Sequence, residues 1–378
     1  MQRYRRHQEG STDVLIAGGG PAGCALAIAA AGSGLSVLVL ERSRYGGPRV
    51  GEHLTPDAQP TLEALGLFER FHAASHQPCL GIRAAWGTET LYDRDYLFNV
   101  YGHGWNLDRQ QFDAMLAEAA EKAGAVVLTS AQLAAFEACN GGWRTRLKGG
   151  ARDGHTIVAR FLVDATGRAA ALARRLGSQR LARDKLVGLC AWLPSQEPGD
   201  GAGERLLIEA IETGWWYTTR LPGDRCVAGL LSDHDLVPSG MVAAATAWTE
   251  QLARTRHVKA LIGGYGPVVV WQRRSANSSI LAPMTGEHWL AVGDAASAFD
   301  PLSSTGILKA LQSGMAAASA IVLSLAGDRN ALSAYAREVT REFAGYLDER
   351  QFFYAREQRW PEEPFWQRRY VAPQEGVC

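Results

Sequence analysis

The stretch Asp13-Val-Leu-Ile-Ala17, followed directly by Gly18-Gly-Gly20-Pro-Ala-Gly23, decides the fold of this chain. The apolar run predicts a β-strand, and the glycines after it match G-x-G-x-x-G in front of residues 24–31, which read as a helix. Residues 36–41 form a second apolar strand that ends in an acid. This strand–loop–helix–strand order is that of a dinucleotide-binding unit.

Each residue type in this unit has a physical reason. Gly18 allows the tight turn, Gly20 lets backbone N–H groups approach a pyrophosphate, and Gly23 lets the helix pack closely on the strand. The helix N-terminus supplies partial positive charge to the phosphates. Glu41 is placed to accept hydrogen bonds from the adenosine ribose. We therefore expect nucleotide binding rather than a glycine-rich turn without a ligand, and by position we add to this site Ala22 and Arg42.

Later segments favour FAD over NAD. The apolar run before Asp164 and Gly167 predicts one strand, the run before Asp294 predicts another, and Arg109 opens an amphipathic helix. In this order the segments resemble the FAD-dependent aromatic hydroxylase superfamily. The resemblance implies that Asp294 holds the ribitol of FAD and that Arg109 lies beside the cofactor, with Asp164 and Gly167 also at the site. Taken singly, Asp294 reads equally well as a strand-end turn, and Arg109 as a surface salt bridge.

Two further segments resemble the branch of that superfamily that contains flavin-dependent tryptophan halogenases. These are residues 49–56, which include Gly51-Glu52-His53, and residues 299–307. In that branch the loop matching residues 301–306 lies against the isoalloxazine, and its backbone N–H groups stabilise negative charge on reduced flavin. The resemblance therefore implies three more cofactor-binding residues, namely Pro301, Gly306 and Ile307.

Halogenation itself is not expected. The tryptophan halogenases use a lysine downstream of the G-E-x-x-x-P segment to hold or orient the halogen electrophile, and this chain has no lysine before Lys122. They also carry a glutamate where this chain has Ser303. A closer resemblance is to halogenase-like flavoproteins that mature tryptophylquinone cofactors by oxygenating a tryptophan in an oxidase precursor. It is carried by residues 85–87, 94–99, 101–109, 214–217 and 365–369.

The function this implies is monooxygenation of an aromatic side chain, above all tryptophan in a peptide or protein precursor, through a flavin C4a-hydroperoxide. By motif position the catalytic candidates are Glu52, His53, Ser303 and Ser304. His53 reads equally well as a loop histidine. The alternatives from other classes are a flavin-dependent halogenase, an FAD-dependent reductase or dehydrogenase, and a chaperone with structural FAD. No second G-x-G-x-x-G follows a strand, so electrons are expected from NAD(P)H docking directly or from a separate flavin reductase.

The expected fold class is α/β, a Rossmann-like FAD-binding domain with an inserted, mostly antiparallel sheet and a helical C-terminal tail. We assign residues 1–75, 105–181 and 275–327 to a discontinuous FAD-binding domain. Residues 76–104 and 182–274 are assigned to a substrate domain, and residues 328–378 to the C-terminal segment. The aromatic and basic tail reads as core packing, as a cleft closure or as a dimer contact.

Bulk composition excludes several classes. The chain has 378 residues, and Lys plus Arg equals Asp plus Glu at 39 each, so no net field attracts nucleic acid. The six cysteines have no metal-ligand spacing, so no metal is expected. Residues 1–13 lack the apolar core of a secretory signal and read as a frayed tail. Residues 307–326 include Lys309 and read as a buried helix rather than a membrane span. A cytoplasmic enzyme is expected.

Overall fold

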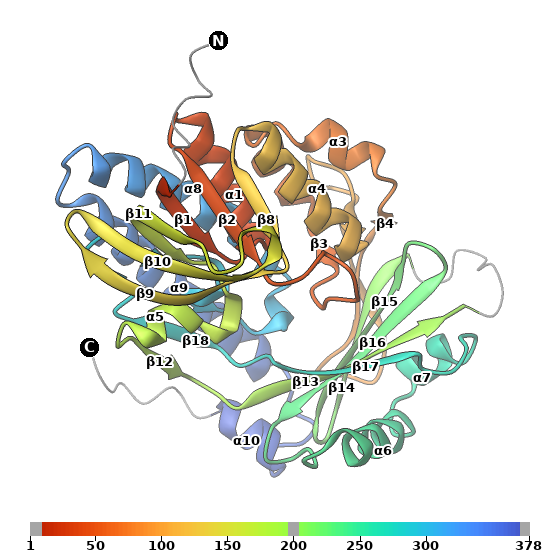
Figure 1. Ribbon diagram of the computed structural model, residues 1–378. Coiled ribbons are helices and arrows are strands. Elements are labelled where there is room, and N and C mark those ends of the chain that lie inside the picture. The colour runs from red at the N-terminus through yellow and green to blue at the C-terminus, as the bar shows by residue number, and fades with distance from the viewer. Residues whose placement is uncertain (1–9, 196–203, 371–378) are drawn as a thin grey trace.

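The computed structural model describes residues 10–195 and 204–370, and it contains two large sheets with helices packed around them (Figure 1). Residues 1–13 were expected to be a frayed tail, and residues 1–9 of it lie outside the described residues. The expectation was wrong for residues 11–13, because the first strand begins at Ser11. The expected α/β class, with an FAD-type sheet, an inserted antiparallel sheet and a helical C-terminal region, is confirmed.

The first sheet has the strand order β19-β20-β11-β1-β2-β8, extended by β10 on β11 and β9 on β10. Its strands β1, β2, β8, β11 and β20 pair in parallel. The near-continuous apolar sequences of β1 and β2 fit burial on both faces. The strand bounds are β1 (Ser11–Ala17), β2 (Val37–Glu41), β8 (Val126–Thr129), β9 (Ala131–Cys139), β10 (Gly142–Gly149), β11 (Thr156–Asp164), β19 (Thr285–Gly286) and β20 (Trp289–Ala291).

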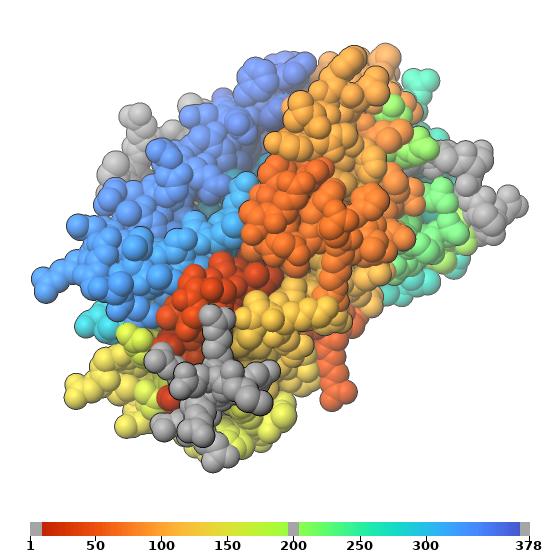
Figure 2. Space-filling model, turned by 90° about the horizontal axis from the view of Figure 1, so that it is seen from above, coloured from red at the N-terminus to blue at the C-terminus, as the bar shows by residue number. Residues whose placement is uncertain are grey.

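Helices from distant parts of the chain cover this sheet. Helix α1 (Pro21–Gly32) packs against α4 (Arg109–Lys122) and α8 (Gly306–Leu325), and α8 packs against α9 (Ala331–Ala355). Figure 2 shows the blue C-terminal helices beside the red N-terminal residues. Among the described residues, α8 is the one helix whose length and apolar composition would suit a membrane span. Its contacts with α1 and α9, and its buried Lys309, are those of a core helix.

The second sheet has the order β17-β13-β16-β15-β14-β5-β6, and all its neighbours are antiparallel except β14 with β5. Its strands are β5 (Gly81–Ala85), β6 (Tyr92–Asp95), β13 (Leu186–Pro194), β14 (Arg205–Ile211), β15 (Gly214–Leu221), β16 (Arg225–Asp233) and β17 (Val270–Ser275). Side chains alternate between its faces. Trp216 packs with α6 (Met241–Leu252) and α7 (His257–Ile262), while Trp215 points to the opposite face. Figure 1 shows α6 and α7 below this sheet, away from the first sheet.

Small elements connect these parts. One three-stranded sheet contains β3 (His53–Leu54), β4 (Gln77–Cys79) and β7 (Gly104–Asn106), and another contains β12 (Gln179–Ala182), β18 (Ser279–Ala282) and β21 (Ser297–Ala298). The remaining helices are η2 (Pro56–Ala58), α2 (Gln59–Ala64), α3 (Phe68–Ala73), η3 (Gly150–Arg152), η4 (Gly167–Ala169), α5 (Ala171–Arg175), η5 (Gly293–Ala295), η6 (Pro301–Ser303) and α10 (Pro364–Tyr370).

The aromatic tail is packed into the core. Trp366 on α10 is fully buried, and its indole N–H donates to the Ile211 carbonyl at 2.9 Å. The buried guanidinium of Arg369 lies 2.8 Å from the buried carboxylate of Asp233, at the end of β16. The sequence left core packing, a cleft closure and a dimer contact open for the tail. For α10 the structure shows core packing.

This buried ion pair gives a stability prediction. Asp233→Ala should lower the free energy of unfolding by about 3–5 kcal/mol, because it leaves the buried Arg369 charge without its partner. The control is Asp235→Ala, which removes the partly exposed partner of Arg368 at 2.7 Å and should cost less than about 1 kcal/mol. Urea unfolding of both variants decides the matter, and equal losses would contradict the assignment.

Candidate active site

A cavity of about 310 Å³ lies between the carboxyl ends of the parallel strands and the face of the second sheet. Ligands of open α/β sheets bind in this position. Many of the residues predicted from sequence meet on its wall, namely Gly20, Ala22, Glu52, His53, Arg109, Gly167, Asp294, Pro301, Ser303, Ser304, Gly306 and Ile307. The other predicted residues do not line it, and these are Gly18, Gly23, Glu41, Arg42 and Asp164.

The glycines of the first loop divide into two kinds. A Cβ on Gly18, whose φ is +115°, would lie 2.1 Å from the Ala165 carbonyl oxygen, and a Cβ on Gly23 would lie 2.0 Å from the Gly18 oxygen. These two allow the loop to pack. Gly20 is different, because a Cβ there would meet nothing within 4 Å and the residue faces the cavity at the start of α1. That open cradle at a helix N-terminus fits a pyrophosphate.

The Glu41 side chain binds the backbone of the glycine loop. Its carboxylate accepts hydrogen bonds from the Gly19 N–H at 3.0 Å and from the Ser43 N–H at 2.9 Å. Burial alone would raise its pKa, but these bonds and the nearby Arg49 outweigh burial and lower it. Glu41 is therefore an ionised acceptor at the expected strand end, where its contact with a ribose stays a prediction. The neighbouring Arg42 is exposed to solvent.

Asp164 has a role in the turn that sequence reasoning did not specify. Its carboxylate accepts bonds from the Thr166, Leu172 and Ala173 backbone N–H groups at 2.9, 2.9 and 2.8 Å. It thereby fixes the turn that carries Gly167 and the start of α5.

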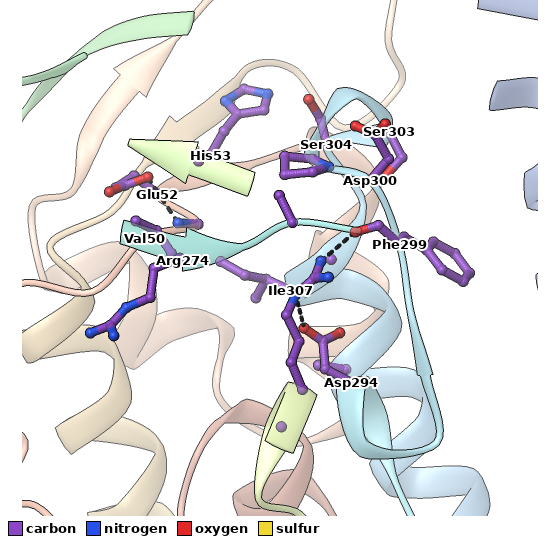
Figure 3. A pocket seen from close by; sticks show the side chains of 18 of the residues that line it. Val50, Glu52, His53, Arg274, Asp294, Phe299, Asp300, Ser303, Ser304 and Ile307 are labelled. Atoms are coloured by element: carbon purple, nitrogen blue, oxygen red, sulfur yellow. Dashed lines mark hydrogen bonds and ion pairs between the residues drawn. The ribbon is translucent and has the colours of Figure 1, made fainter. Parts of the chain in front are cut away.

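Asp294 faces the cavity as an acceptor, as Figure 3 shows. The Nζ of Lys309 lies 3.1 Å from its carboxylate, and the Nε of Arg168 lies 3.5 Å away. Burial would raise the pKa of Asp294, but the two cations outweigh it and lower the pKa. An ionised carboxylate on the wall suits the hydroxyl groups of a ribitol. Sequence reasoning missed this role of Lys309, whose only signal was a cation in an apolar helix.

Arg109 holds the loop on the other side of the cavity. Its Nη1 donates to the carbonyl oxygens of Val50 and Gly51 at 2.7 and 3.0 Å. Its Nε and Nη2 bind the buried Asp113 carboxylate at 3.1 Å. The arginine therefore fixes the backbone of the segment that presents Glu52 to the cavity.

Glu52 and His53 differ in their environments. Glu52 is buried, and its Oε2 accepts the Gly51 N–H at 2.9 Å, while its Oε1 has no hydrogen-bond partner among the described residues. Burial raises its pKa to about 7 against the opposing effect of Arg109. The His53 ring contacts the Asn106 Oδ1 at 3.3 Å and the Tyr96 hydroxyl at 3.0 Å. Burial lowers the pKa of His53 to about 4, so the ring is neutral at pH 7.

The loop after η5 is held by a buried network that the sequence did not reveal. The Asp300 carboxylate accepts the Leu302 N–H at 2.9 Å and the Tyr354 hydroxyl at 2.8 Å, and it pairs with Arg350 at 3.3 Å. Ser304 has φ +54°, a left-handed conformation that turns the chain into α8. The network positions the Pro301–Ser303 turn on the cavity wall, as Figure 3 shows for Asp300, Ser303 and Ser304.

The second sheet supplies the opposite wall, with Leu206, Ile208, Trp215, Tyr217 and Cys190 among its lining residues. Gly229 makes this wall possible, because a Cβ there would lie 2.3 Å from the Tyr217 ring. The Trp215 indole N–H donates to the Tyr354 hydroxyl at 3.0 Å, so the wall is tied to the Asp300 network. This wall is apolar with a few polar groups, as small-molecule sites are.

A family model described as an FAD binding domain matches residues 11–210. The chain belongs to this FAD-binding family. The match covers the dinucleotide loop and most of the first sheet, and it agrees with the cradle at Gly20. The protein is thus a flavin-dependent enzyme of the aromatic hydroxylase and halogenase-like superfamily, as the resemblance implied.

The similar proteins include an oxidoreductase and halogenases. The FAD-dependent oxidoreductase LodB of Marinomonas mediterranea is 29% identical over 96% of this chain and 97% of its own length. Tryptophan 2-halogenase of Chondromyces crocatus is 26% identical over 86% of this chain, which spans 63% of the halogenase.

Among solved structures, the myxobacterial halogenase CndH is similar with a TM-score of 0.85, over 97% of this chain and 87% of that one. At 24% identity it supports the fold alone. The peptidyl tryptophan dihydroxylase QhpG is similar with a TM-score of 0.79 and 26% identity, over 97% of this chain and 80% of that one.

The open space at Gly20 predicts a separation of cofactor binding from stability. Gly20→Val should change the stability of the FAD-free protein by less than about 1 kcal/mol. It should weaken FAD binding by at least roughly tenfold, because the side chain fills the pyrophosphate cradle. Gly23→Val should instead destabilise the FAD-free protein, and Gly32→Ala, with open space around its Cβ, is the control for both effects. FAD titration and thermal melts measure the two properties, and unchanged FAD affinity in Gly20→Val would refute the cradle.

The raised pKa of Glu52 predicts a pH-dependent stability change. Below about pH 4.5 the carboxyl is protonated in both folded and unfolded protein, whereas above pH 7 the folded protein must hold a buried charge. Stability therefore falls as pH rises through this window. Glu52→Gln should be neutral at low pH and should stabilise the FAD-free protein by roughly 2–3 kcal/mol above pH 7. Urea unfolding at several pH values tests this, and a pH-independent difference would show that folding does not shift the pKa of Glu52.

Proposed function

We propose that the protein is an FAD-dependent monooxygenase that hydroxylates an aromatic side chain, most directly tryptophan, within a peptide or protein precursor. When bound, FAD would activate molecular oxygen and supply the electrons for its reduction. The chain's own residues would hold the cofactor, orient the ring, exclude water and move protons.

The observation that carries the choice of hydroxylation over halogenation is the charge on the cavity wall. Its described lining residues include Arg109, Arg168 and Arg274 but no lysine. Lys309 lies buried behind Asp294 and is engaged by that carboxylate. A halogenase of the resembled type needs a lysine amine in the cavity to hold the halogen electrophile. Guanidinium groups are poor replacements, because they stay protonated and carry their charge on a planar fork.

The wall formed by Trp215, Leu206 and Ile208 supports an aromatic substrate, since an apolar surface stabilises a flat ring and keeps out water. The similarity to QhpG, a peptidyl tryptophan dihydroxylase, supports a tryptophan presented in a polypeptide. The similarity to LodB, an FAD-dependent oxidoreductase, is compatible with this class. Three further points stay predictions. They are the residue ranges of a separate substrate domain, the cytoplasmic location, and the supply of electrons by NAD(P)H or a flavin reductase.

Each part of the site has a task in this proposal. Gly20 and Asp294 would hold the pyrophosphate and the ribitol. Residues 301–306 and the Val50–Gly51 backbone, fixed by Arg109, would enclose the flavin ring. Glu52 would exchange protons at its carboxyl oxygen, because its pKa near 7 lets it give and take them at neutral pH. His53, Ser303 and Ser304 would contact the reacting groups from the same wall.

The proposal is tested with FAD-loaded protein, NAD(P)H with and without a flavin reductase, ¹⁸O₂ gas, chloride and bromide. Peptides with one tryptophan are compared with matched peptides that carry leucine and with free tryptophan. Mass spectrometry should show oxygen from the gas added to the tryptophan peptide, and no halogen isotope pattern. A halogenated indole would make the protein a halogenase. Turnover of free tryptophan with the peptides left unchanged would refute the polypeptide substrate.

A further inference from the structure

Glu52 borders two separate cavities. One is the main cavity, and the other is a small cavity of about 20 Å³ that Arg109 also lines. Among the residues lining the small cavity are Asp108, Arg225 and Leu221. Its volume suits one water molecule, and its charged lining offers that water several hydrogen-bond partners. Figure 3 shows Glu52 at one side of the main cavity, beside Val50 and Arg274.

The small cavity lies close to solvent, whereas Glu52 does not. The Asp108 carboxylate pairs with the Arg225 guanidinium at 2.7 Å, and their side chains are 23% and 38% exposed. Glu52 is only 3% exposed. Its Oε1, which lacks a hydrogen-bond partner among the described residues, is a buried polar atom that a water or a reacting group would satisfy. The carboxyl therefore borders both the main cavity, where the chemistry would take place, and a polar site near the surface.

The groups that face Glu52 allow both of its protonation states. Arg109 on α4 and the Tyr217 hydroxyl on β15 favour the carboxylate. The thiols of Cys190 on β13 and Cys226 on β16 are neutral, because burial raises the pKa of each to about 12. Burial of Glu52 outweighs the favourable groups and raises its pKa to about 7. At neutral pH the side chain is thus able to pick up a proton on one side and release it on the other.

The proposed chemistry requires proton entry. Hydroxylation follows R–H + O₂ + 2e⁻ + 2H⁺ → R–OH + H₂O, in which one oxygen atom enters the C–H bond and the other is reduced to water. A hydride donor brings the two electrons with only one proton, so the second proton comes from solvent. The cavity must nevertheless exclude bulk water to protect its reactive contents. A carrier that spans the wall resolves this conflict.

We propose that Glu52 is the proton inlet of the main cavity, and that it is recharged by a water held in the small cavity beside Asp108 and Arg225. This deepens the proposed function and rests on it for the hydroxylation reaction. The inlet also serves a reaction that needs no substrate, because reduction of O₂ to H₂O₂ by the reduced enzyme consumes two electrons and two protons.

The test follows reoxidation of reduced, FAD-loaded protein by O₂ without substrate, using flavin absorbance and peroxide release from about pH 5.5 to about 8.5. The reoxidation rate of the unaltered protein should fall as pH rises through about 7. Glu52→Gln should be slower by roughly 10²-fold and lose this pH dependence. Glu52→Ala should regain rate when formate is added, because a small acid replaces the carboxyl. Unchanged pH profiles in both variants would overturn the proposal.

A second pair of variants tests the small cavity itself. Leu221→Phe fills it, and Leu221→Met keeps the volume of the native side chain as a matched control. Leu221→Phe should slow reoxidation by roughly tenfold relative to the control, because no water can then pass a proton to Glu52. The affinity for FAD should stay within about twofold of the control. Equal rates in the two variants would show that no water in this cavity feeds Glu52.

These experiments separate the inlet from the choice of substrate. If reoxidation depends on Glu52 but no aromatic peptide is hydroxylated, the inlet stands and the proposed substrate is wrong. If a peptide is hydroxylated while Glu52→Gln keeps the native pH profile, the function stands and the inlet is wrong.

Discussion

The close approach of the first loop to the end of β11 is the constraint on which the site depends. Gly18 lies so near the Ala165 carbonyl that a Cβ would be 2.1 Å from its oxygen, and Gly23 is equally close to Gly18. Only because these contacts are made does α1 start at the carboxyl ends of the parallel strands, with Gly20 open to the cavity. The carboxylate of Asp294 follows the neighbouring strand β20 and reaches the same cavity.

The second requirement is a wall that joins this cavity to a substrate surface. Trp215 and Tyr217 stand on one strand of the second sheet, two residues apart, and therefore face the same side. A hydrogen bond from Trp215 to Tyr354, and another from Tyr354 to Asp300, connect this wall to the loop that starts α8. Three distant parts of the sequence thus meet at one buried carboxylate. These buried hydrogen bonds connect the substrate wall to the loop.

Sequence patterns predicted the parts of this arrangement that depend on local rules. Glycine spacing, apolar strands and the acid after β20 are short-range signals, so the FAD-type fold was foreseen and is confirmed by the family match. Networks made by residues far apart in sequence gave no such signal. Lys309 looked like an interruption of an apolar helix, and it is the partner of Asp294. Glu41 and Asp164 were assigned to the cofactor by position, and these assignments stay predictions; the bonds of their carboxylates to backbone N–H groups were not foreseen. The aromatic tail was ambiguous because burial of Trp366 depends on the end of β14, which the sequence does not place beside it.

The most direct test of the central claim is a crystal structure of the protein with FAD bound. The pyrophosphate should lie at Gly20 and the ribitol at Asp294. The flavin ring should lie between the Val50–Gly51 backbone and residues 301–306, with its edge toward Trp215 and Tyr217. FAD bound outside this cavity, or with its adenine end against the second sheet, would contradict the claim that one chamber holds both cofactor and substrate.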